Sequence, residues 1–183
     1  MLSQDEVKES RKLELIYTNI LIFVSGLVLY LLFTSNLGLF WLTLGFIFLI
    51  DTIISIRINL PYALFSFLPL MRKLKEHEKE KLGQEAKKVY RLSIITQIIV
   101  IPVFIFFAYL NWGKTISINP LVVIVMLAAV LIFANITLLV NRKKIDQGSS
   151  EQLRSYTEVQ LLVGLAGSLI FVGVIFIFAV LTL

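Results

Sequence analysis

Long uninterrupted runs of apolar residues dominate this chain, and shorter polar segments separate them. Crossing the hydrocarbon layer of a membrane takes about 20 helical residues. Runs such as Phe171 to Phe178 are apolar at every position, whereas the strands of a transmembrane barrel alternate apolar and polar residues. The pattern therefore predicts an all-α polytopic membrane helix bundle with about five transmembrane helices. The predicted spans are Leu13 to Phe33, Leu37 to Ile56, Leu92 to Trp112, Pro120 to Val140 and Val159 to Leu181.

The connections between the spans divide the chain into two hairpins and one further helix. Turns of a few residues join the first span to the second and the third to the fourth. We expect residues 1–183 to form a single transmembrane domain. The longest connection, residues 57–91, is expected to be a cytoplasmic loop that contains an interfacial apolar segment, residues 60–71, and then a charged amphipathic helix. Gly83 is a position where that helix can break.

Basic residues lie almost entirely at one side of the predicted spans. Of the 17 Lys and Arg residues, only Lys114 falls on the opposite side. Because basic residues near helix ends stay in the cytoplasm during insertion, we expect an amino terminus inside and a carboxyl terminus outside. The net charge of +5 is then explained by topology and by the anionic lipid of the inner leaflet, and no nucleic-acid partner is expected. The Ile, Leu, Phe and Lys bias and the short outer loops favour the plasma membrane of a bacterium.

The charged helix is the main candidate for contacts outside the hydrocarbon layer. It could dock a cytoplasmic partner, or it could lie on anionic lipid as a basic amphipathic stretch. Both interpretations fit its dense mixed charge. The candidate contact residues are Arg72, Lys73, Lys75, Lys79, Lys81, Lys87 and Lys88.

Polar side chains occur at a similar depth in all five predicted spans. Asp51 is the only acidic residue deep in a span, where a carboxylate costs about 2.5 to 3.5 kcal/mol on insertion scales. The polar layer could form a cytoplasm-facing pocket in which Asp51 is the charged or proton-carrying group. Alternatively, its members could hold helices together, with Asp51 protonated or reaching Arg57. The layer consists of Asn19, Asp51, Gln97, Asn135 and Ser168.

Small residues in the last predicted span indicate close helix packing. Gly164 and Ser168 have the small-xxx-small spacing that lets helix backbones approach, and Gly167 adds to the same smooth region. Gly38 and Gly45 form a similar stripe in the second span. Packing within the chain and an interface with a partner or a second copy both fit these stripes.

No residue pattern in the sequence predicts catalysis or a cofactor. The chain has no cysteine, which excludes disulfides and thiolate metal sites. His77 is the only histidine, and its place between Glu76 and Glu78 predicts a solvated side chain. Bis-histidine haem ligation would need a second histidine. We therefore expect no enzymatic activity and no cofactor.

Two functions remain compatible with the sequence. The first is a non-catalytic integral membrane subunit or accessory protein that binds a membrane partner complex, favoured by small size, short outer loops and one dominant cytoplasmic loop. The alternative is a small homo-oligomeric transporter or channel that uses Asp51 in an inner-leaflet polar pocket.

Overall fold

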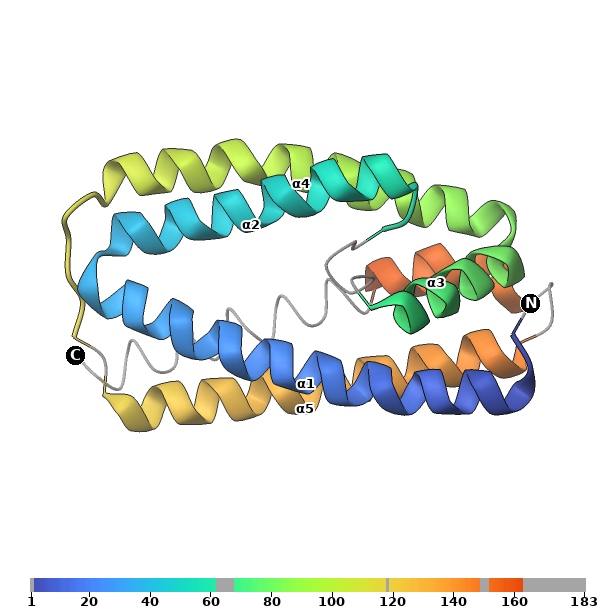
Figure 1. The fold of residues 1–183 in the computed structure, drawn as a ribbon. Helices are drawn as coiled ribbons and strands as arrows, with labels where there is room; N and C mark the ends of the chain where they lie inside the picture. Colours follow the sequence, from blue (N-terminus) through green and yellow to red (C-terminus); the bar gives the residue numbers. More distant parts are fainter. Residues whose placement is uncertain (1, 62–67, 118, 149–151, 163–183) are drawn as a thin grey trace. The chain divides into compact units, whose positions relative to one another are not determined.

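The computed structural model describes residues 2–61, 68–117, 119–148 and 152–162. These residues contain helices, turns and short connections, and none of them forms a strand. They belong to two compact units, Met1–Ser117 and Ile118–Leu183, which are described separately. Within the described ranges, four helices are long and apolar enough to cross a membrane (Figure 1). They are α1 (Gln4–Ser35), α2 (Leu37–Ile58), α4 (Gln84–Leu110) and α5 (Pro120–Gln147).

The all-helical architecture predicted from the apolar runs is confirmed for the described residues. Three of the predicted spans lie within α1, α2 and α5, and the predicted span Leu92 to Trp112 lies within α4 except for its last two residues, because α4 ends at Leu110. The fifth predicted span, Val159 to Leu181, falls almost entirely outside the described residues. What the structure supports is thus a multi-pass helical membrane protein.

The start of α1 is fixed by a capping box. The Ser3 hydroxyl accepts a hydrogen bond from the Glu6 backbone N–H at 3.3 Å, and the Ser3 backbone N–H donates to the Glu6 carboxylate at 2.8 Å. These reciprocal bonds satisfy amide groups that have no partner within the helix. Hydrogen bonds from the Ser3 backbone and then from its hydroxyl lower the pKa of Glu6.

At the other end of the first unit, hydrogen bonds to one asparagine connect the α1–α2 turn with the end of α4. Asn36 ends α1, and its side-chain oxygen accepts from the Leu39 N–H at 3.2 Å at the start of α2. The same oxygen accepts from the Gly113 N–H at 3.2 Å, just after α4. A backbone bond of 2.8 Å from Leu37 N to the Lys114 carbonyl adds to this connection. The α1–α2 turn and the end of α4 therefore lie at one level.

The antiparallel helices α2 and α4 pack closely along their length. A Cβ atom at Gly38 would lie 2.6 Å from the Trp112 Cα atom, so only glycine allows this approach. Farther along, the Trp41 and Phe107 rings lie 5.3 Å apart, and Phe48 meets Phe104 edge-on at 5.5 Å. Interlocking aromatic rings thus fill the middle of the helix pair.

A short helix, α3 (Pro69–Leu82), lies at the end of the first unit where α2 ends and α4 begins (Figure 1). Proline at its first position has no amide hydrogen to leave unpaired. The predicted break at Gly83 is confirmed, with a φ of 55° that favours glycine. The charged segment is therefore two helices, since its second half is the first part of α4. Met71 and Leu74 of α3 are fully buried.

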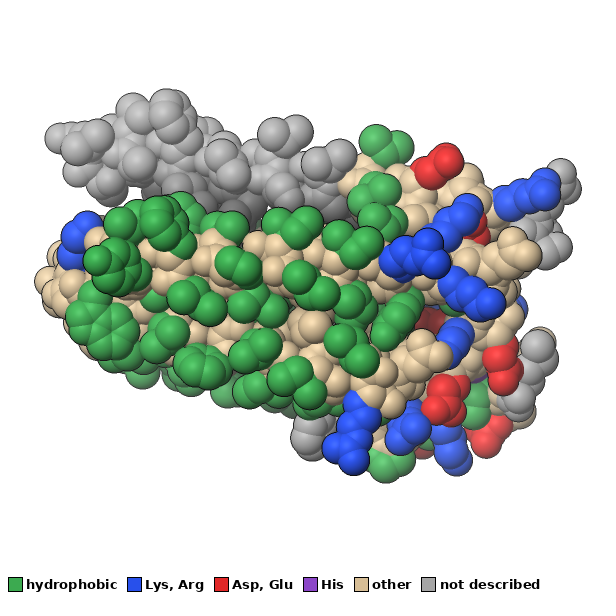
Figure 2. All heavy atoms as spheres, turned by 90° about the horizontal axis from the view of Figure 1, so that it is seen from above, with side chains coloured by type: hydrophobic (Ala, Val, Ile, Leu, Met, Phe, Trp, Pro, Cys, Tyr) green, Lys and Arg blue, Asp and Glu red, His purple; other side chains and the backbone are tan. Residues whose placement is uncertain are grey.

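The long helices of the first unit carry many apolar side chains on the outside, and their buried positions include many polar ones. The buried residues of α1 are all polar, namely Ser10, Arg11, Glu14 and Thr18. Figure 2 shows hydrophobic side chains covering the long helices, while charged side chains gather at one end. An aqueous solvent would reverse this arrangement, whereas a hydrocarbon solvent requires it. The exposed apolar residues of α1 are Leu13, Ile16, Ile20, Phe23, Val24, Leu27, Val28 and Leu31.

In the second unit, the start of α5 is capped by the residue before it. The Asn119 side chain accepts from the Leu121 N–H at 2.9 Å, and Pro120 is the first residue of α5. After α5, a short 3-10 helix, η2 (Gln152–Ser155), leads into a helix that is described as far as residue 162. Buried Leu153 lies against Gly148 at the end of α5, and the Lys144 amine lies 5.9 Å from the Tyr156 ring centroid.

Candidate functional site

Two groups of buried polar side chains lie in the first unit. The first, which we name the ionic cluster, consists of Arg11 and Glu14 of α1 with Lys75 and Glu78 of α3. The Lys75 amine lies 3.1 Å from Glu14 Oε1 and 2.9 Å from Glu78 Oε2. The Arg11 guanidinium donates to Glu14 Oε2 at 3.0 Å and to Glu78 Oε1 as well. Each carboxylate thus has two cationic partners, and the four formal charges sum to zero.

The ionic cluster is shielded from solvent. The side chain of Glu14 is 3% exposed, that of Glu78 is 10% exposed and that of Lys75 is 21% exposed. Removing charges from water costs several kcal/mol per ion, and this cost is recovered only when every charge is paired and hydrogen-bonded. Such a cluster is stable only in the arrangement that pairs every charge, and any other arrangement leaves a buried charge without a partner. It therefore fixes the position of α3 against α1.

Burial and neighbouring carboxylates act in opposite directions on the pKa of Lys75. Burial disfavours its charged form, but the attraction of Glu78 and then of Glu14, with hydrogen bonds to both, outweighs burial. The pKa of Lys75 is accordingly raised above its ordinary value of 10.5. At neutral pH the amine is fully charged, as the balanced cluster requires.

We expect Lys75→Met to lower the free energy of unfolding by about 2 kcal/mol. This difference between variant and wild type should stay constant from pH 7 to about pH 10. A group with a raised pKa in the folded state stabilises fully below its unfolded pKa and loses this effect as the pH rises toward the folded value. Thermal melts of wild type and variant across this pH series measure the difference. A difference that already shrinks between pH 7 and pH 9 would contradict the assignment.

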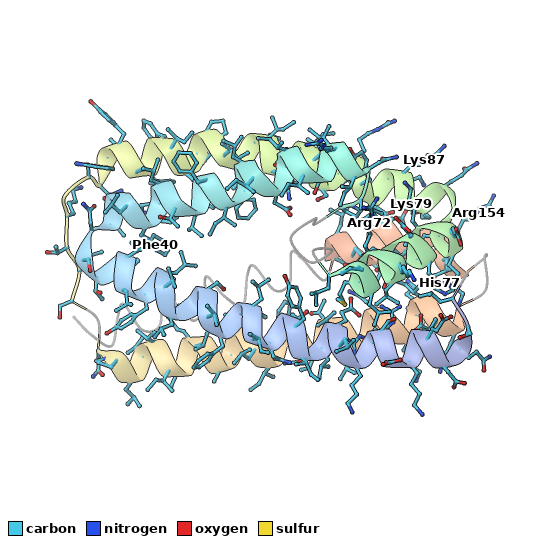
Figure 3. The ribbon with its side chains drawn as sticks, in the orientation of Figure 1. Phe40, Arg72, His77, Lys79, Lys87 and Arg154 are labelled. Carbon is cyan, nitrogen blue, oxygen red and sulfur yellow. The ribbon has the colours of Figure 1, made fainter. Side chains whose placement is uncertain are left out.

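His77 corrects an expectation from the sequence. The prediction of a solvated side chain is wrong, because His77 is only 9% exposed and lies beside the start of α1 (Figure 3). Its Nδ1 atom accepts a long hydrogen bond of 3.4 Å from the Leu2 backbone N–H. The histidine therefore contributes to the contact between α3 and the amino-terminal segment.

The second buried group, which we name the Asp51 network, joins α2 to α4. The Gln97 amide donates to Asp51 Oδ2 at 2.6 Å, and the Thr52 hydroxyl lies 2.9 Å from Gln97 Oε1. Asp51, Thr52 and Gln97 are each at most 5% exposed. One helical turn away toward the charged end, Ser55 and Ser93 are also buried on the facing surfaces. This polar contact continues the aromatic packing between α2 and α4.

The other members of the predicted polar layer take different places. The Asn19 amide donates to the Leu15 carbonyl at 2.8 Å, within α1. The Asn135 amide donates to the Leu131 carbonyl at 2.7 Å, within α5 in the second unit. Ser168 lies outside the described residues, as do Gly164 and Gly167. Of the predicted layer, the structure thus brings together Asp51 and Gln97.

The candidate contact residues of the charged segment differ in their surroundings. Lys75 belongs to the ionic cluster. The Lys79 amine donates to the Asn59 carbonyl at 3.0 Å, so it holds α3 near the end of α2 (Figure 3). Lys81 is partly buried. The remaining four are exposed, and two of them pair with a glutamate on their own helix, Arg72 with Glu76 and Lys88 with Glu85. The four exposed residues are Arg72, Lys73, Lys87 and Lys88.

Sequence reasoning did not identify Arg11, Glu14 and Glu78 as members of a site. One signal was present, because Glu14 lies inside the first predicted apolar run, three residues after Arg11. A carboxylate in such a run needs a partner, and i,i+3 spacing supplies one on the same helix face. The pairing with Glu78, 67 positions away, depends on the tertiary fold.

Both groups of polar side chains hold neighbouring helices together. In the ionic cluster, charges neutralise one another, and in the Asp51 network, donors meet acceptors. Among the residues that the structure describes, no group of three or more His, Cys, Asp or Glu side chains could hold a metal ion.

We expect Asp51→Leu to lower the free energy of unfolding by about 1 to 2 kcal/mol, because the Gln97 amide then loses its buried acceptor. Asn111→Leu is the matched control, since its exposed amide bonds mainly to its own helix, at the Phe107 carbonyl 2.9 Å away. Unfolding in mixed detergent micelles measures both variants. Equal tolerance of the two substitutions would reduce Asp51 to an incidental feature of the α2–α4 contact.

No protein-family model matches the sequence, and the searches of curated proteins and of solved structures found no significant match.

Proposed function

We propose that this chain is a non-catalytic integral membrane subunit or accessory protein that binds a membrane partner complex. The observation that carries the proposal is the contrast between the contacts and the outer surface of its helices. The buried charged groups described above are paired with one another, whereas the outer surfaces are broad and apolar. A protein built this way acts through its helix faces and its charged end.

The proposed orientation has five spans, the amino terminus and α3 in the cytoplasm and the carboxyl terminus outside. Support comes from the first unit, where the start of α1, the end of α2, α3 and the start of α4 lie at one end (Figure 1). Charged side chains gather at that end (Figure 2). The opposite end carries a single basic residue, Lys114, after α4. This distribution follows the rule that basic residues remain inside. A bacterial plasma membrane is the proposed location.

The charged end offers a defined surface to a partner. The ionic cluster holds α3 against α1, and Lys79 holds it near α2. Arg72 and Glu76 of the same helix pair with each other and are both about half exposed, at 54% and 51%, so they are within reach of a partner. A rigid helix binds a partner at lower entropic cost than a flexible loop does.

Site-specific photo-cross-linking in the native membrane tests the proposal. A photoreactive residue at Ile20 of α1 or Ile132 of α5, both well exposed, is expected to give a discrete adduct with another membrane protein. The same residue at Met71, which is fully buried, is the matched control and should give none. Adducts with lipid alone at every exposed position of the four long helices would contradict the proposal.

The Asp51 network favours a second candidate, a small homo-oligomeric transporter or channel. A carboxylate buried at membrane depth, with a hydroxyl and an amide around it, is a feature of many ion and proton pathways. This candidate predicts cross-links between two copies of the chain. It also predicts a solute flux that Asp51→Asn abolishes, whereas the subunit proposal predicts no flux from the isolated protein.

A further inference from the structure

Two arginines of the first unit lie at the same level on neighbouring helices. Asp51 of α2 and Gln97 of α4 are hydrogen-bonded at 2.6 Å and so define a common level in this antiparallel pair. Arg57 is six residues beyond Asp51, and Arg91 is six residues before Gln97. At a rise of 1.5 Å per residue, each arginine lies about 9 Å from that level, on the side of the charged end.

Both arginines are exposed and lie where the apolar parts of their helices stop. Leu92 begins the apolar run of α4, and α2 ends at Ile58. The buried residues Ser55 and Ser93 are each two positions from an arginine, which places the guanidinium groups away from the α2–α4 contact. The two side chains therefore point outward from the helix pair at the boundary of the hydrocarbon layer.

The charge at this level is positive without an acidic counterpart. No acidic residue occurs between Thr52 and Pro61 or between Ala86 and Gln97. The acids nearest to them in the sequence are both buried: Asp51 is bonded to Gln97, and Glu85 is bonded to Lys88 at 2.5 Å. Elsewhere at this end, Glu14 and Glu78 are enclosed in the ionic cluster. These two acids are thus neutralised inside, and exposed Glu76 pairs with Arg72 on α3, while Arg57 and Arg91 remain on the outer surface of α2 and α4.

The apolar face of α3 contacts the protein itself, because Met71 and Leu74 are fully buried. The described residues of α3 consequently leave no second apolar face to insert into lipid. Lys87, one turn before Arg91, extends the exposed basic surface at the start of α4 (Figure 3).

We infer that Arg57 and Arg91 bind the phosphate groups of anionic phospholipids at the membrane surface. A guanidinium presents a planar fork of donors that matches phosphate oxygens, and it is more weakly hydrated than an amine. Outward-pointing arginines at one level suit a layer of headgroups around the bundle, whereas a soluble ligand would require them to converge. The inference deepens the proposed function, because it assigns lipid to this surface and leaves the helix faces and α3 to a protein partner.

Native mass spectrometry of the full chain, released from nanodiscs of equal phosphatidylglycerol and phosphatidylcholine, tests the inference. Wild type is expected to retain phosphatidylglycerol in preference to phosphatidylcholine. Each of Arg57→Gln and Arg91→Gln should weaken that preference about fivefold, and the double variant about twenty-fivefold, because one surface charge contributes about 1 kcal/mol to anionic-lipid binding. Arg57→Lys with Arg91→Lys keeps the charge and should retain most of the preference.

Lys114→Gln is the matched control, since it removes one exposed positive charge beyond the opposite end of α4. The Lys114 amine already donates to Asn111 Oδ1 at 3.2 Å, so its loss should change the preference less than the loss of either arginine does. An unchanged preference in the double glutamine variant would overturn the inference, as would an equal loss in the Lys114 control. Circular dichroism of each variant confirms that the helices are intact. Nanodiscs carry both lipids on both faces and contain no partner, so this result is independent of the orientation and of the subunit proposal.

Discussion

Replacing Glu78 with glutamine is expected to lower the free energy of unfolding by about 3 to 4 kcal/mol, the largest effect of any single substitution discussed here. Glu78 accepts bonds from both Lys75 and Arg11 in the ionic cluster. Without its charge, two buried cations share the single carboxylate of Glu14. The excess positive charge has little access to water, since the side chains of Arg11 and Lys75 are 9% and 21% exposed.

Glu76→Gln is the matched control on the same helix. Glu76 also pairs with an arginine, Arg72, at 3.1 Å, but both side chains are about half exposed. An exposed ion pair contributes at most about 1 kcal/mol, so this variant should differ little from wild type. Unfolding with sodium dodecyl sulfate in mixed micelles measures both. Equal effects of the two substitutions would show that the ionic cluster is not the element that holds α3.

Replacing Gly38 with valine is expected to destabilise the first unit by about 3 kcal/mol, because it separates α2 from α4. A Cβ atom at position 38 would lie 2.6 Å from the Trp112 Cα atom and 3.0 Å from the Ala108 carbonyl oxygen. Both are backbone atoms, so a change of rotamer cannot relieve the overlap. The helices must move apart, and the contact between the Trp41 and Phe107 rings is weakened as a result.

Gly45 provides the control for this prediction. A Cβ atom there would lie 3.5 Å from Phe104 Cβ, an ordinary van der Waals contact. Gly45→Ala should therefore be neutral or slightly stabilising, while Gly38→Ala already destabilises. Thermal unfolding followed by tryptophan fluorescence suits this comparison, because Trp41 and Trp112 both lie at the end of the pair near Gly38. An equal response to alanine at both positions would contradict the α2–α4 packing described above.

The helices themselves could be predicted from the sequence, because a membrane span has a simple physical signature. In the hydrocarbon layer, backbone N–H and C=O groups cannot form hydrogen bonds with water. A helix satisfies these groups within one segment, so a long apolar run is expected to be helical. The positions where helices begin and end could be predicted equally well from local residues. Gly83 ends α3 with a positive φ, and Asn119 with Pro120 begins α5. These features depend on residues that are close together in the sequence.

The packing of the helices could be predicted only in part. A membrane helix that is apolar on all sides carries no amphipathic pattern to reveal its buried face. Small or polar residues mark that face in α2, and the sequence did indicate Gly38, Gly45 and Asp51. The partners of those residues, and the pairing of Arg11 with Glu78, are set by tertiary contacts between distant segments. His77 was misjudged because its charged neighbours suggested solvent, whereas its own side chain faces the start of α1.

In the proposed orientation, the end of the first unit that carries the ionic cluster and α3 faces the cytoplasm, while the turn after α4 faces outside. Single cysteines at Gln84, which starts α4, and at Thr115, beyond its end, test this claim in a chain without native cysteines. In intact cells, a membrane-impermeant thiol reagent should label the cysteine at position 115, and the one at position 84 only after the membrane is opened. Labelling of position 84 in intact cells, with protection of position 115, would contradict the account.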